Sequence, residues 1–324
     1  MRLALAGDTM LGRGVASALA TGPPERLVAP EVAELMRTAD LVVANLECCV
    51  SERGRRWDAP GKPFFFRAPP NAVELLERLG VGCVTLANNH ALDYGQEALL
   101  DTLDRLAGAG IAAVGAGPAL DEARRPVVLD AAGRRVAVVG VTDHPADFAA
   151  GPARSGVAYA DLAAGVPEWL LAAVRDAAAH ADAVLVTPHW GPNMTRVPVP
   201  HVRRAAAALV EAGATLVAGH SAHVPHGVGG RVLYDLGDFL DDYAVDRRLR
   251  NDLGLLFMVT VDEGGPVELE AVPLKLDFCH TRLADGTDAA WMRRRFRDAC
   301  AALGTGVAEA DGRLLVSWRR TCGP

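Results

Sequence analysis

The amino-acid sequence predicts an α/β protein, and two regularities along the chain support this prediction. Short apolar runs that end abruptly in polar residues alternate with Ala/Leu/Glu/Arg segments of helical spacing. Continuous Val/Ala/Leu runs of this length fit strands that are buried on both faces. Strands that alternate with helices indicate sheets covered by helices. The expected strands lie within residues 3–8, 41–47, 82–90, 111–117, 134–144, 183–190 and 215–223, and the expected helices lie within 71–80, 97–110, 168–181 and 202–213.

The pattern changes beyond residue 223. Strand-like segments at 231–240, 253–265 and 267–277 follow one another without helices between them, which indicates an antiparallel extension of the sheet system. The remaining stretch holds an Arg/Ala-rich amphipathic helix at 289–304, expected to cover the sheet, and a short strand at 312–318. We therefore expect a catalytic domain over residues 1–280, with the helix and strand of 281–324 packed on the same domain. The Pro/Arg-rich stretch 51–70 is expected to form a long loop.

Composition excludes several classes of protein. Half of the 324 residues are hydrophobic, which provides for a large core, and the formal net charge of −7 argues against a nucleic-acid partner. The six cysteines lack C-x-x-C spacing and are expected to be reduced thiols. The N-terminus turns polar within a few residues, and no stretch is long and apolar enough for a membrane span. We expect a cytoplasmic protein without a membrane partner, and no pattern specifies its oligomeric state.

Polar residues capable of metal binding or proton transfer follow nearly all of the expected strands. In open α/β sheets, ligands bind at the carboxyl ends of the strands. Taken singly, Asp8 is better explained as a helix cap, and residues 88–90 as a polar turn. Their recurrence at six strand ends instead indicates one site. The residues concerned are Asp8, Asn45, Glu47, Asn88, Asn89, His90, Asp143, His144, His189, His220 and His223.

The histidine pair at 220 and 223 is the strongest local signal. Two imidazoles three residues apart, directly after a buried strand, form a natural pair of metal ligands or proton carriers. With the neighbouring Asp, Glu and Asn they make a mixed oxygen/nitrogen set. Such a set suits Mn, Mg, Ca, Fe or Zn better than a metal that prefers thiolates. His180 and His201 lie in helical segments and are expected to have no role in the site.

Six motifs in this order resemble the CapA family, which is linked to capsule and poly-γ-glutamate biosynthesis and has the calcineurin-like metallophosphoesterase fold. The resemblance extends from Arg2 to about Asp242 and implies a four-layer α/β/β/α sandwich of two mixed sheets flanked by helices. The motifs are GDTMLGR, ANLECCVS, TLANNHALDYG, TPHWGPN, GHSAHVPHG and YDLGDFL.

The resemblance also implies roles for individual residues. His90 corresponds to the acid/base histidine beside the metal. Such enzymes usually begin with Asp-x-His, whereas this chain has Met10 at the histidine position and Glu47 near the position of a bridging aspartate. A thioether is a poor ligand for a hard cation, so we expect one divalent metal ion rather than two. The implied ligands are Asp8, Glu47, Asn89, His189, His220 and His223.

Histidine–aspartate pairs indicate acid/base chemistry. Asp93 is placed to orient His90, and Asp238 is placed to orient His220 or His223. Two such pairs on opposite faces of a substrate permit removal of a proton from one face and its return to the other. Some CapA-like proteins are similar in this respect to peptide epimerases of lasso-peptide pathways, in which a C-terminal residue is inverted. The leading hypothesis is therefore metal-assisted epimerisation at the Cα atom of the C-terminal residue of a peptide.

Two other functions remain open. In the first, the histidines hold a metal that activates water against a phosphoester or a γ-glutamyl amide. In the second, the chain is a non-catalytic subunit for polymer synthesis, although a scaffold has no need for so many titratable groups at one sheet edge.

The loop at 51–70 is a candidate wall of a peptide groove, because it combines basic and aromatic side chains. The alternative is that it covers the sheet, with residues 64–66 partly in the core. The candidate substrate-binding residues are Arg56, Trp57, Lys62, Phe65 and Arg67 in this loop, together with Trp190 beside His189.

Overall fold

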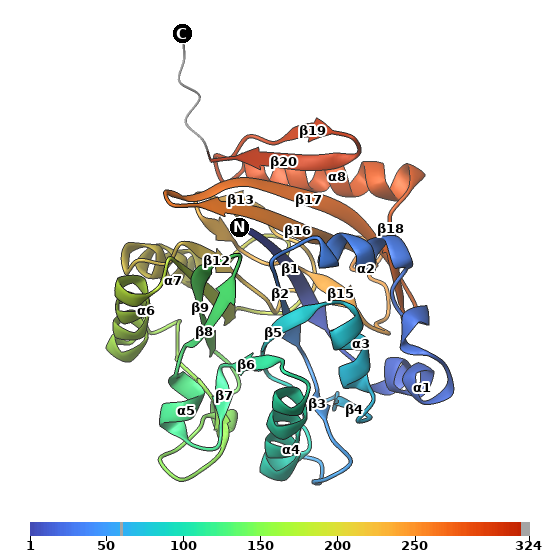
Figure 1. Cartoon of the computed structure of the whole chain (residues 1–324). Coiled ribbons are helices and arrows are strands. Elements are labelled where there is room, and N and C mark those ends of the chain that lie inside the picture. Colours follow the sequence, from blue (N-terminus) through green and yellow to red (C-terminus); the bar gives the residue numbers. More distant parts are fainter. Residues whose placement is uncertain (59–60, 319–324) are drawn as a thin grey trace.

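The computed structural model describes residues 1–58 and 61–318, so Cys322 lies outside the described residues. Most strands belong to two mixed sheets that face each other, and helices lie on both outer sides (Figure 1). The strand order of the first sheet is β19-β20-β17-β16-β1-β2-β5-β6, with β15 beside β1 and β18 beside β17. Its strands are β1 (Arg2–Thr9), β2 (Leu41–Leu46), β5 (Val81–Thr85), β6 (Ala112–Val114), β15 (Asp238–Leu240), β16 (Leu253–Asp262), β17 (Gly265–Asp277), β18 (His280–Leu283), β19 (Ala308–Ala310) and β20 (Arg313–Ser317).

The second sheet has the order β13-β14-β12-β11-β9-β8, and two short strand pairs, β3 with β4 and β7 with β10, lie apart from both large sheets. The remaining strands are β3 (Cys49–Val50), β4 (Arg67–Ala68), β7 (Ala116–Gly117), β8 (Val127–Ala131), β9 (Arg134–Thr142), β10 (Gly156–Val157), β11 (Ala183–His189), β12 (Leu216–Ala218), β13 (Val228–Gly229) and β14 (Val232–Leu233). The helices are α1 (Arg13–Thr21), α2 (Pro30–Arg37), α3 (Ala72–Arg78), α4 (Gly95–Gly108), α5 (Leu120–Arg124), α6 (Glu168–His180), α7 (Pro200–Glu211) and α8 (Gly286–Ala301).

Three hydrophobic clusters separate the layers. On β1, Leu3 and Leu5 point into the cluster between the two sheets, whereas Ala4 and Ala6 point into the cluster beneath helices α1 to α4. This alternation is the period of two that a strand imposes on its side chains. Helices α6 and α7 pack on the outer face of the second sheet over a third cluster. The four-layer α/β/β/α architecture is therefore confirmed, and burial of both strand faces explains the continuous apolar runs.

The segment after residue 230 differs in part from the prediction. The long strands β16 and β17 pair antiparallel as expected, but the run at 231–240 is split between the two sheets. β14 joins the second sheet, while β15 joins the first and runs parallel to β1, with Asp8 opposite Asp238. The split occurs at Gly237, whose φ of 71° lies in the left-handed region that glycine tolerates best. This short crossing brings residues of both sheets to one place.

The C-terminal helix and strand pack on the same body as the rest of the chain. β20 pairs with β17, and α8 extends Met292, Phe296 and Cys300 into the cluster between the sheets. The spacing of these buried residues is that of one helical face. Helix α8 therefore covers one end of the core between the sheets rather than the outer face of either sheet (Figure 1).

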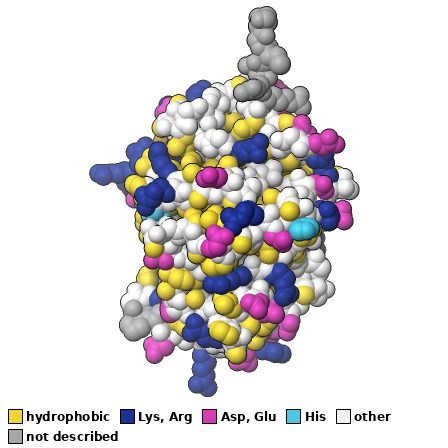
Figure 2. All heavy atoms as spheres, turned by 90° about the vertical axis from the view of Figure 1, so that its left-hand side faces the viewer, with side chains coloured by type: hydrophobic (Ala, Val, Ile, Leu, Met, Phe, Trp, Pro, Cys, Tyr) yellow, Lys and Arg dark blue, Asp and Glu magenta, His cyan; other side chains and the backbone are white. Residues whose placement is uncertain are grey.

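The surface and the cysteines agree with the composition. On the face shown in Figure 2, acidic and basic side chains are interspersed with hydrophobic ones, so the negative charge is distributed there. In the described part of the chain no helix combines the length and the apolar character needed to cross a membrane. The described cysteines, Cys48, Cys49, Cys83, Cys279 and Cys300, are buried free thiols.

Candidate active site

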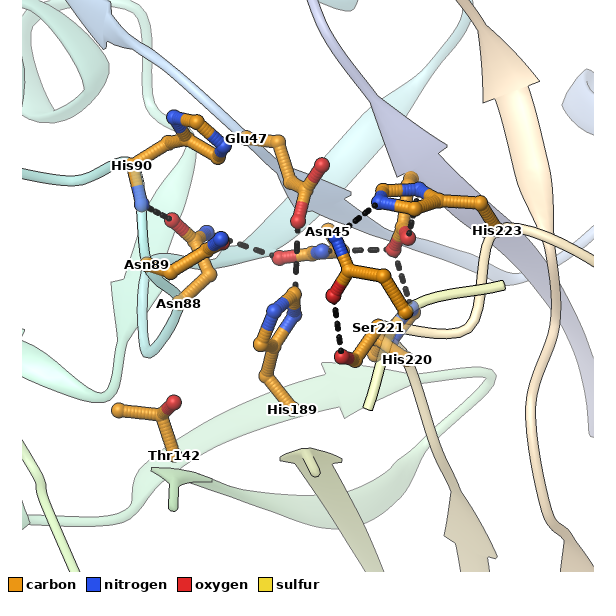
Figure 3. A network of polar contacts seen from close by, with 12 residues as sticks. Asn45, Glu47, Asn88, Asn89, His90, Thr142, His189, His220, Ser221 and His223 are labelled. Carbon is orange, nitrogen blue, oxygen red and sulfur yellow. Dashed lines mark hydrogen bonds and ion pairs between the residues drawn. The ribbon is translucent and has the colours of Figure 1, made fainter. Parts of the chain in front are cut away.

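The carboxyl ends of the parallel strands of both sheets converge on a buried polar cluster (Figure 3). Asp8, near the end of β1, is 1% exposed, and its Oδ1 accepts a 2.7 Å hydrogen bond from Asn45 Nδ2 on the neighbouring strand β2. Asn88 in turn donates to Asn45 Oδ1 at 2.9 Å. His220 Nδ1 lies 3.1 Å from the same Asp8 oxygen. Side chains from three strand ends therefore fix the position of this carboxylate.

A ligand set for a cation surrounds Asp8. Potential ligand atoms of Asp8, Glu47 and His223 all lie within 4.8 Å of one another. His189 Nδ1, at the end of β11, lies 3.5 Å from Glu47 Oε1 and so brings in a residue of the second sheet. The expected ligands thus come from both sheets and meet at one point, with Asn89 beside them in Figure 3.

The polar atoms of this cluster fit a divalent cation. Several of them are buried and have no hydrogen-bond partner among the described residues, which is costly unless a ligand satisfies them. Carboxylate and amide oxygens with imidazole nitrogens are ligands of hard and borderline divalent cations. The atoms without a partner are Glu47 Oε1, Asn89 Oδ1, both ring nitrogens of His189 and Asp238 Oδ2.

Burial and the neighbouring groups shift the pKa values of the two acids of this cluster in opposite directions. Burial alone would raise the pKa of Asp8, but hydrogen bonds from His220 and His223 outweigh it and hold this pKa well below its usual value. Burial, with the Asp8 charge adding to it, raises the pKa of Glu47 well above its usual value. Without a cation, Asp8 therefore loses its proton more readily than an exposed aspartate, and Glu47 loses its proton less readily than an exposed glutamate.

The first histidine–aspartate pair lies where strand β5 leads to helix α4. His90 Nδ1 lies 2.6 Å from Asp93 Oδ2, and the His90 ring stacks on Phe66 with centroids 4.0 Å apart. Asp93 also accepts from the Phe66 backbone N–H at 2.6 Å, and Lys62 Nζ lies 3.1 Å from its other oxygen. Burial lowers the pKa of His90, and the hydrogen bond to Asp93 only partly offsets this. His90 is therefore neutral near pH 7.

The second pair lies across the strand crossing between the sheets. His223 Nδ1 lies 2.8 Å from Asp238 Oδ1 and 3.2 Å from Asp8 Oδ2, so Asp238 orients this histidine rather than His220. Its Nε2 lies 3.2 Å from the side-chain nitrogen of Asn193. Burial alone would lower the pKa of His223, but Asp238, Asp8 and Glu47 outweigh it and hold this pKa well above its usual value. Without a cation, His223 is therefore protonated.

A pocket of about 310 Å³ opens beside both pairs. Because each Nδ1 atom is held by an aspartate, the Nε2 atoms of His90 and His223 are the ring nitrogens available to this pocket. Phe64, Phe66 and Tyr243 form the aromatic part of the remaining wall, and Arg13 lies beside them with its guanidinium 5.3 Å from the Phe66 ring centroid. The pocket is lined by Arg13, Phe64, Phe66, His90, Asn193, Met194, His223, Tyr243, Ala244 and Asn251.

The predicted substrate-binding residues lie around this pocket rather than on it. Lys62 donates to the Asn89 carbonyl at 2.7 Å, and Trp57 donates to Asp147 at 2.8 Å. Arg56 lies over the Phe65 ring, and Arg67 over the Tyr94 ring. Trp190 is 2% exposed in the core of the second sheet, where its indole N–H donates to the Tyr234 carbonyl, so it has no access to a substrate.

The residues that line the pocket instead gave only a weak signal in the sequence. Phe66 and Phe64 alternate with the predicted Phe65 on the same loop, Arg13 is the last residue of the motif GDTMLGR, and Tyr243 follows the motif YDLGDFL by three residues. Met10, at the position of the absent metal ligand, is fully buried in the hydrophobic cluster under α1 to α4. His144 and Asp143 pair as predicted, and His201, expected to have no role, lies 3.3 Å from Asp143 Oδ2. These three groups line a separate pocket beside the site.

Known proteins resemble this chain over most of its length. A probable polyglutamine synthesis accessory protein of Mycobacterium tuberculosis is 32% identical over 363 aligned residues, which cover 96% of this chain and 94% of that protein. The PGA biosynthesis protein CapA of Bacillus subtilis is 31% identical over 73% of this chain and 62% of its own length. The capsule biosynthesis protein CapA of Bacillus anthracis is 29% identical over 85% of this chain and 67% of its own length.

A solved structure supports the fold. The crystal structure of a hypothetical protein from Thermus thermophilus superposes with a TM-score of 0.50, at 17% identity, over 86% of this chain and all of that chain. Residues 2–243 match the family described as bacterial capsule synthesis protein PGA_cap, and this range holds both histidine–aspartate pairs and the expected metal ligands. The chain therefore belongs to this family of bacterial capsule synthesis proteins.

Proposed function

We propose that the protein is a metal-dependent acid/base enzyme that inverts the Cα centre of the C-terminal residue of a peptide. The observation that supports this most directly is the pocket shared by His90 and His223. Each of these histidines has its Nδ1 atom within hydrogen-bond distance of a buried aspartate, Asp93 in one case and Asp238 in the other. An aspartate in this position fixes the tautomer of the imidazole, as a proton-transfer residue requires.

The two histidines have the protonation states that a two-base reaction needs. His90 is neutral because burial lowers its pKa, and His223 is protonated because three carboxylates outweigh burial and raise its pKa. Neighbouring groups whose pKa values are moved apart are typical of an acid and a base that act together. His90 is thus the base and His223 the acid in the first half of a turnover.

The proton balance of the reaction closes without a co-reactant. His90 Nε2 accepts the Cα proton, and the electron pair of the C–H bond moves onto the adjacent carbonyl group. His223 Nε2 then delivers its proton to the opposite face of Cα, so the product has the same mass as the substrate. A divalent cation held by Asp8, Glu47, Asn89, His189 and His220 would supply positive charge that stabilises the enolate-like intermediate.

Arg13 and the aromatic wall fit the end of a peptide. Arg13 donates through Nε and Nη2 to Asp242, while its Nη1 has no hydrogen-bond partner in the described part of the chain. That remaining donor is placed for a substrate carboxylate. Phe64, Phe66 and Tyr243 provide an apolar surface for the side chain of the same residue.

The experiment is incubation of the metal-loaded protein in deuterated water with synthetic peptides that end in Trp, Phe or Glu, with γ-glutamyl oligomers and with p-nitrophenyl phosphate. Epimerisation predicts a gain of one deuterium at Cα, a D-configured residue on chiral analysis and no cleavage. A new carboxylate or free phosphate, with no deuterium at Cα, would instead identify a hydrolase. His90→Gln should abolish deuterium incorporation.

Hydrolysis of a γ-glutamyl amide or a phosphoester is the second candidate. It is favoured by the proximity of His223 to Asp8 and Glu47, because a histidine that binds the cation cannot also deliver a proton. In this reaction a cation held by Asp8, Glu47 and His223 would activate a water molecule against the amide or the phosphoester. The names of the relatives, which refer to polyglutamine and PGA synthesis, agree with an amide of glutamate as substrate.

The metal content of His223→Gln separates the two candidates. If His223 acts as the proton donor, the variant keeps its metal and loses deuterium exchange. If His223 is a ligand, the variant loses metal affinity by about 10-fold or more. Asp235→Asn provides a control for disturbance of this buried region, since Asp235 accepts from the Ala222 backbone without joining the ligand group.

A further inference from the structure

A second polar pocket, of about 280 Å³, lies between the loop after β11 and helix α8. Three of its lining side chains are arginines, Arg196 on the loop and Arg294 and Arg295 on the helix, and Trp291 forms part of the wall. The helix backbone is held close to the second sheet here, because a Cβ atom on Gly227 would lie 2.4 Å from the Ala299 carbonyl group. The helical wall of the pocket is therefore fixed against the second sheet.

Arg295 is the unusual residue of this pocket. Its Nε and Nη2 atoms are buried and have no hydrogen-bond partner among the residues that the structure describes. Its guanidinium carbon lies 5.8 Å from the centroid of the Trp291 ring. Other arginines of the same helix are paired, since Arg293 and Arg297 both contact Glu309. Buried donors on a charged group are costly when they have no acceptor.

No described side chain in the vicinity offsets this cost. Asp298 lines the same pocket, but it forms no ion pair with these arginines in the described part of the chain. Burial, together with the nearby Arg196 charge, lowers the pKa of Arg295 to about 10. The guanidinium therefore still carries its positive charge near pH 7, beside a second positive charge and, among the described residues, without a counterion.

We propose that Arg196, Arg294 and Arg295 form a binding site for an oxyanion, either a phosphate or a carboxylate group. A planar guanidinium with two adjacent free N–H donors matches the two oxygens of such a group. The anion would neutralise the Arg295 guanidinium and would separate the charges of Arg295 and Arg196. The exposed Arg294 completes the rim.

The loop that forms this site also reaches the reaction pocket. Asn193 and Met194 line the pocket of His90 and His223, and Arg196 and Val197 line the oxyanion site. Two residues of extended chain span at most about 7 Å, so the two pockets are neighbours. An acidic group on an extended substrate can reach the oxyanion site, although the site itself does not depend on which reaction the enzyme performs.

The test is the thermal unfolding of the full-length, metal-loaded protein at constant ionic strength, with inorganic phosphate, tri-glutamate or tri-glutamine added. A ligand that binds only the folded state raises Tm, and an increase of about 2 °C is expected at saturating oxyanion. Arg295→Gln should lose this increase. Arg297→Gln, on the same helix but paired with Glu309, should keep it.

The outcomes show whether the oxyanion site exists and which oxyanion it binds. An increase with phosphate alone assigns a phosphate site. An increase with tri-glutamate that exceeds the one with tri-glutamine, which carries only the terminal carboxylate, assigns a site for side-chain carboxylates. If phosphate and tri-glutamate raise the Tm of Arg295→Gln as much as that of the wild type, the proposal is overturned, because the anions then bind elsewhere. Arg196→Gln is a second variant at an exposed position and should reduce the same increase if Arg295→Gln fails to fold.

Discussion

At the scale of single residues, burial and neighbouring charge give the same side chain different chemistry at different positions. His90 and His223 are both buried and both paired with an aspartate, yet burial prevails in setting the pKa of His90 and carboxylates prevail in setting that of His223. The difference lies in the charged groups that surround each histidine–aspartate pair. Lys62 contacts Asp93 and compensates its charge, whereas Asp8 and Glu47 add negative charge around His223.

The role of Asp93 as a positioning residue is tested by Asp93→Asn. The substitution removes the charge that raises the pKa of His90 while it retains an oxygen to accept from the Phe66 backbone. Loss of an oriented general base typically lowers the rate about 10²–10⁴-fold. Deuterium incorporation should fall within that range, and the acidic limb of the pH–rate profile should move to lower pH.

The matched control is Asp101→Asn. Asp101 is another buried aspartate, on helix α4, which bonds to Ser51 and Arg105 rather than to the site. Its rate and pH profile should equal those of the wild type. An unchanged pH profile in Asp93→Asn would show that this aspartate has only a structural role.

His226 predicts a pH dependence of stability away from the metal cluster. Burial lowers the pKa of His226 to about 4, from 6.5 in the unfolded chain. Between these values the unfolded state binds the extra proton, so the free energy of unfolding decreases as the pH falls from about 6.5 to 4. The expected loss is about 2 kcal/mol at pH 5.

Urea denaturation of the wild type and of His226→Gln at neutral pH and at pH 5 measures this contribution. The variant lacks the titrating group, so its stability should fall less on acidification, by that same amount of about 2 kcal/mol. Equal losses in the two proteins would contradict the prediction.

At the scale of elements, the parallel pairing of β1 with β15 holds the two parts of the site together. Asp8 lies opposite Asp238 in this pairing, and the Asp8 backbone N–H donates to the Gly237 carbonyl at 2.8 Å. The strands approach so closely that a Cβ atom on Gly7 would lie 1.9 Å from the Gly237 oxygen. Only a glycine fits beside that carbonyl. Steric contact alone therefore requires glycine at position 7, whatever its backbone conformation.

Gly7→Ala should therefore damage stability and the site together. Displacement of backbone in a packed region costs about 1–3 kcal/mol, and a shift of Asp8 should weaken metal binding by about 10-fold or more. Urea denaturation and metal titration measure the two effects. Gly108→Ala is the control, because its Cβ atom meets nothing within 4 Å and it lies in helix α4. It should stabilise the protein by about 0.5–1 kcal/mol and leave metal affinity unchanged.

The sequence predicted the elements better than their connections. The strand ends that hold Asp8, Glu47, His90, His189 and His220 were recognisable because an apolar run followed by a polar residue is a local pattern. The division of residues 231–240 between two sheets was not, since it depends on which partner each half pairs with. The pocket wall was missed for a similar reason, because the choice of Phe66 over Phe65 depends on how the loop lies on His90.

At the scale of the whole molecule, the two sheets act as two halves of one binding site. The first sheet contributes Asp8 and Glu47, and the second contributes His189, while the crossing between the sheets contributes Asp238. A cation bound among them would link both sheets, so its binding stabilises the folded state as a whole. Neither sheet alone could provide this set of ligands, because the edge of each sheet holds only some of them.

The number of protons released on metal binding tests whether one cation links the two sheets. It also shows whether His223 is a proton donor or a metal ligand. Without the cation, burial and the Asp8 charge raise the pKa of Glu47 well above 4.5, so above about pH 4.5 the folded chain keeps a proton on this group that the unfolded chain has lost. The folded state then binds more protons than the unfolded state, and the stability of the metal-free protein should decrease as the pH rises above about 4.5. Glu47→Gln should remove the part of that decrease that Glu47 contributes.

A carboxylate that binds a cation must lose its proton, so Mn²⁺ binding at a pH where Glu47 is still protonated should release about one proton from it. Calorimetric titration with Mn²⁺ in buffers of different ionisation enthalpy counts the protons. Release of about one indicates that His223 keeps its proton and remains available as the acid, and about two indicates that His223 becomes a ligand, as hydrolysis requires. Glu47→Gln should lower either count by about one, whereas no release in the wild type would contradict the participation of Glu47 in the metal site.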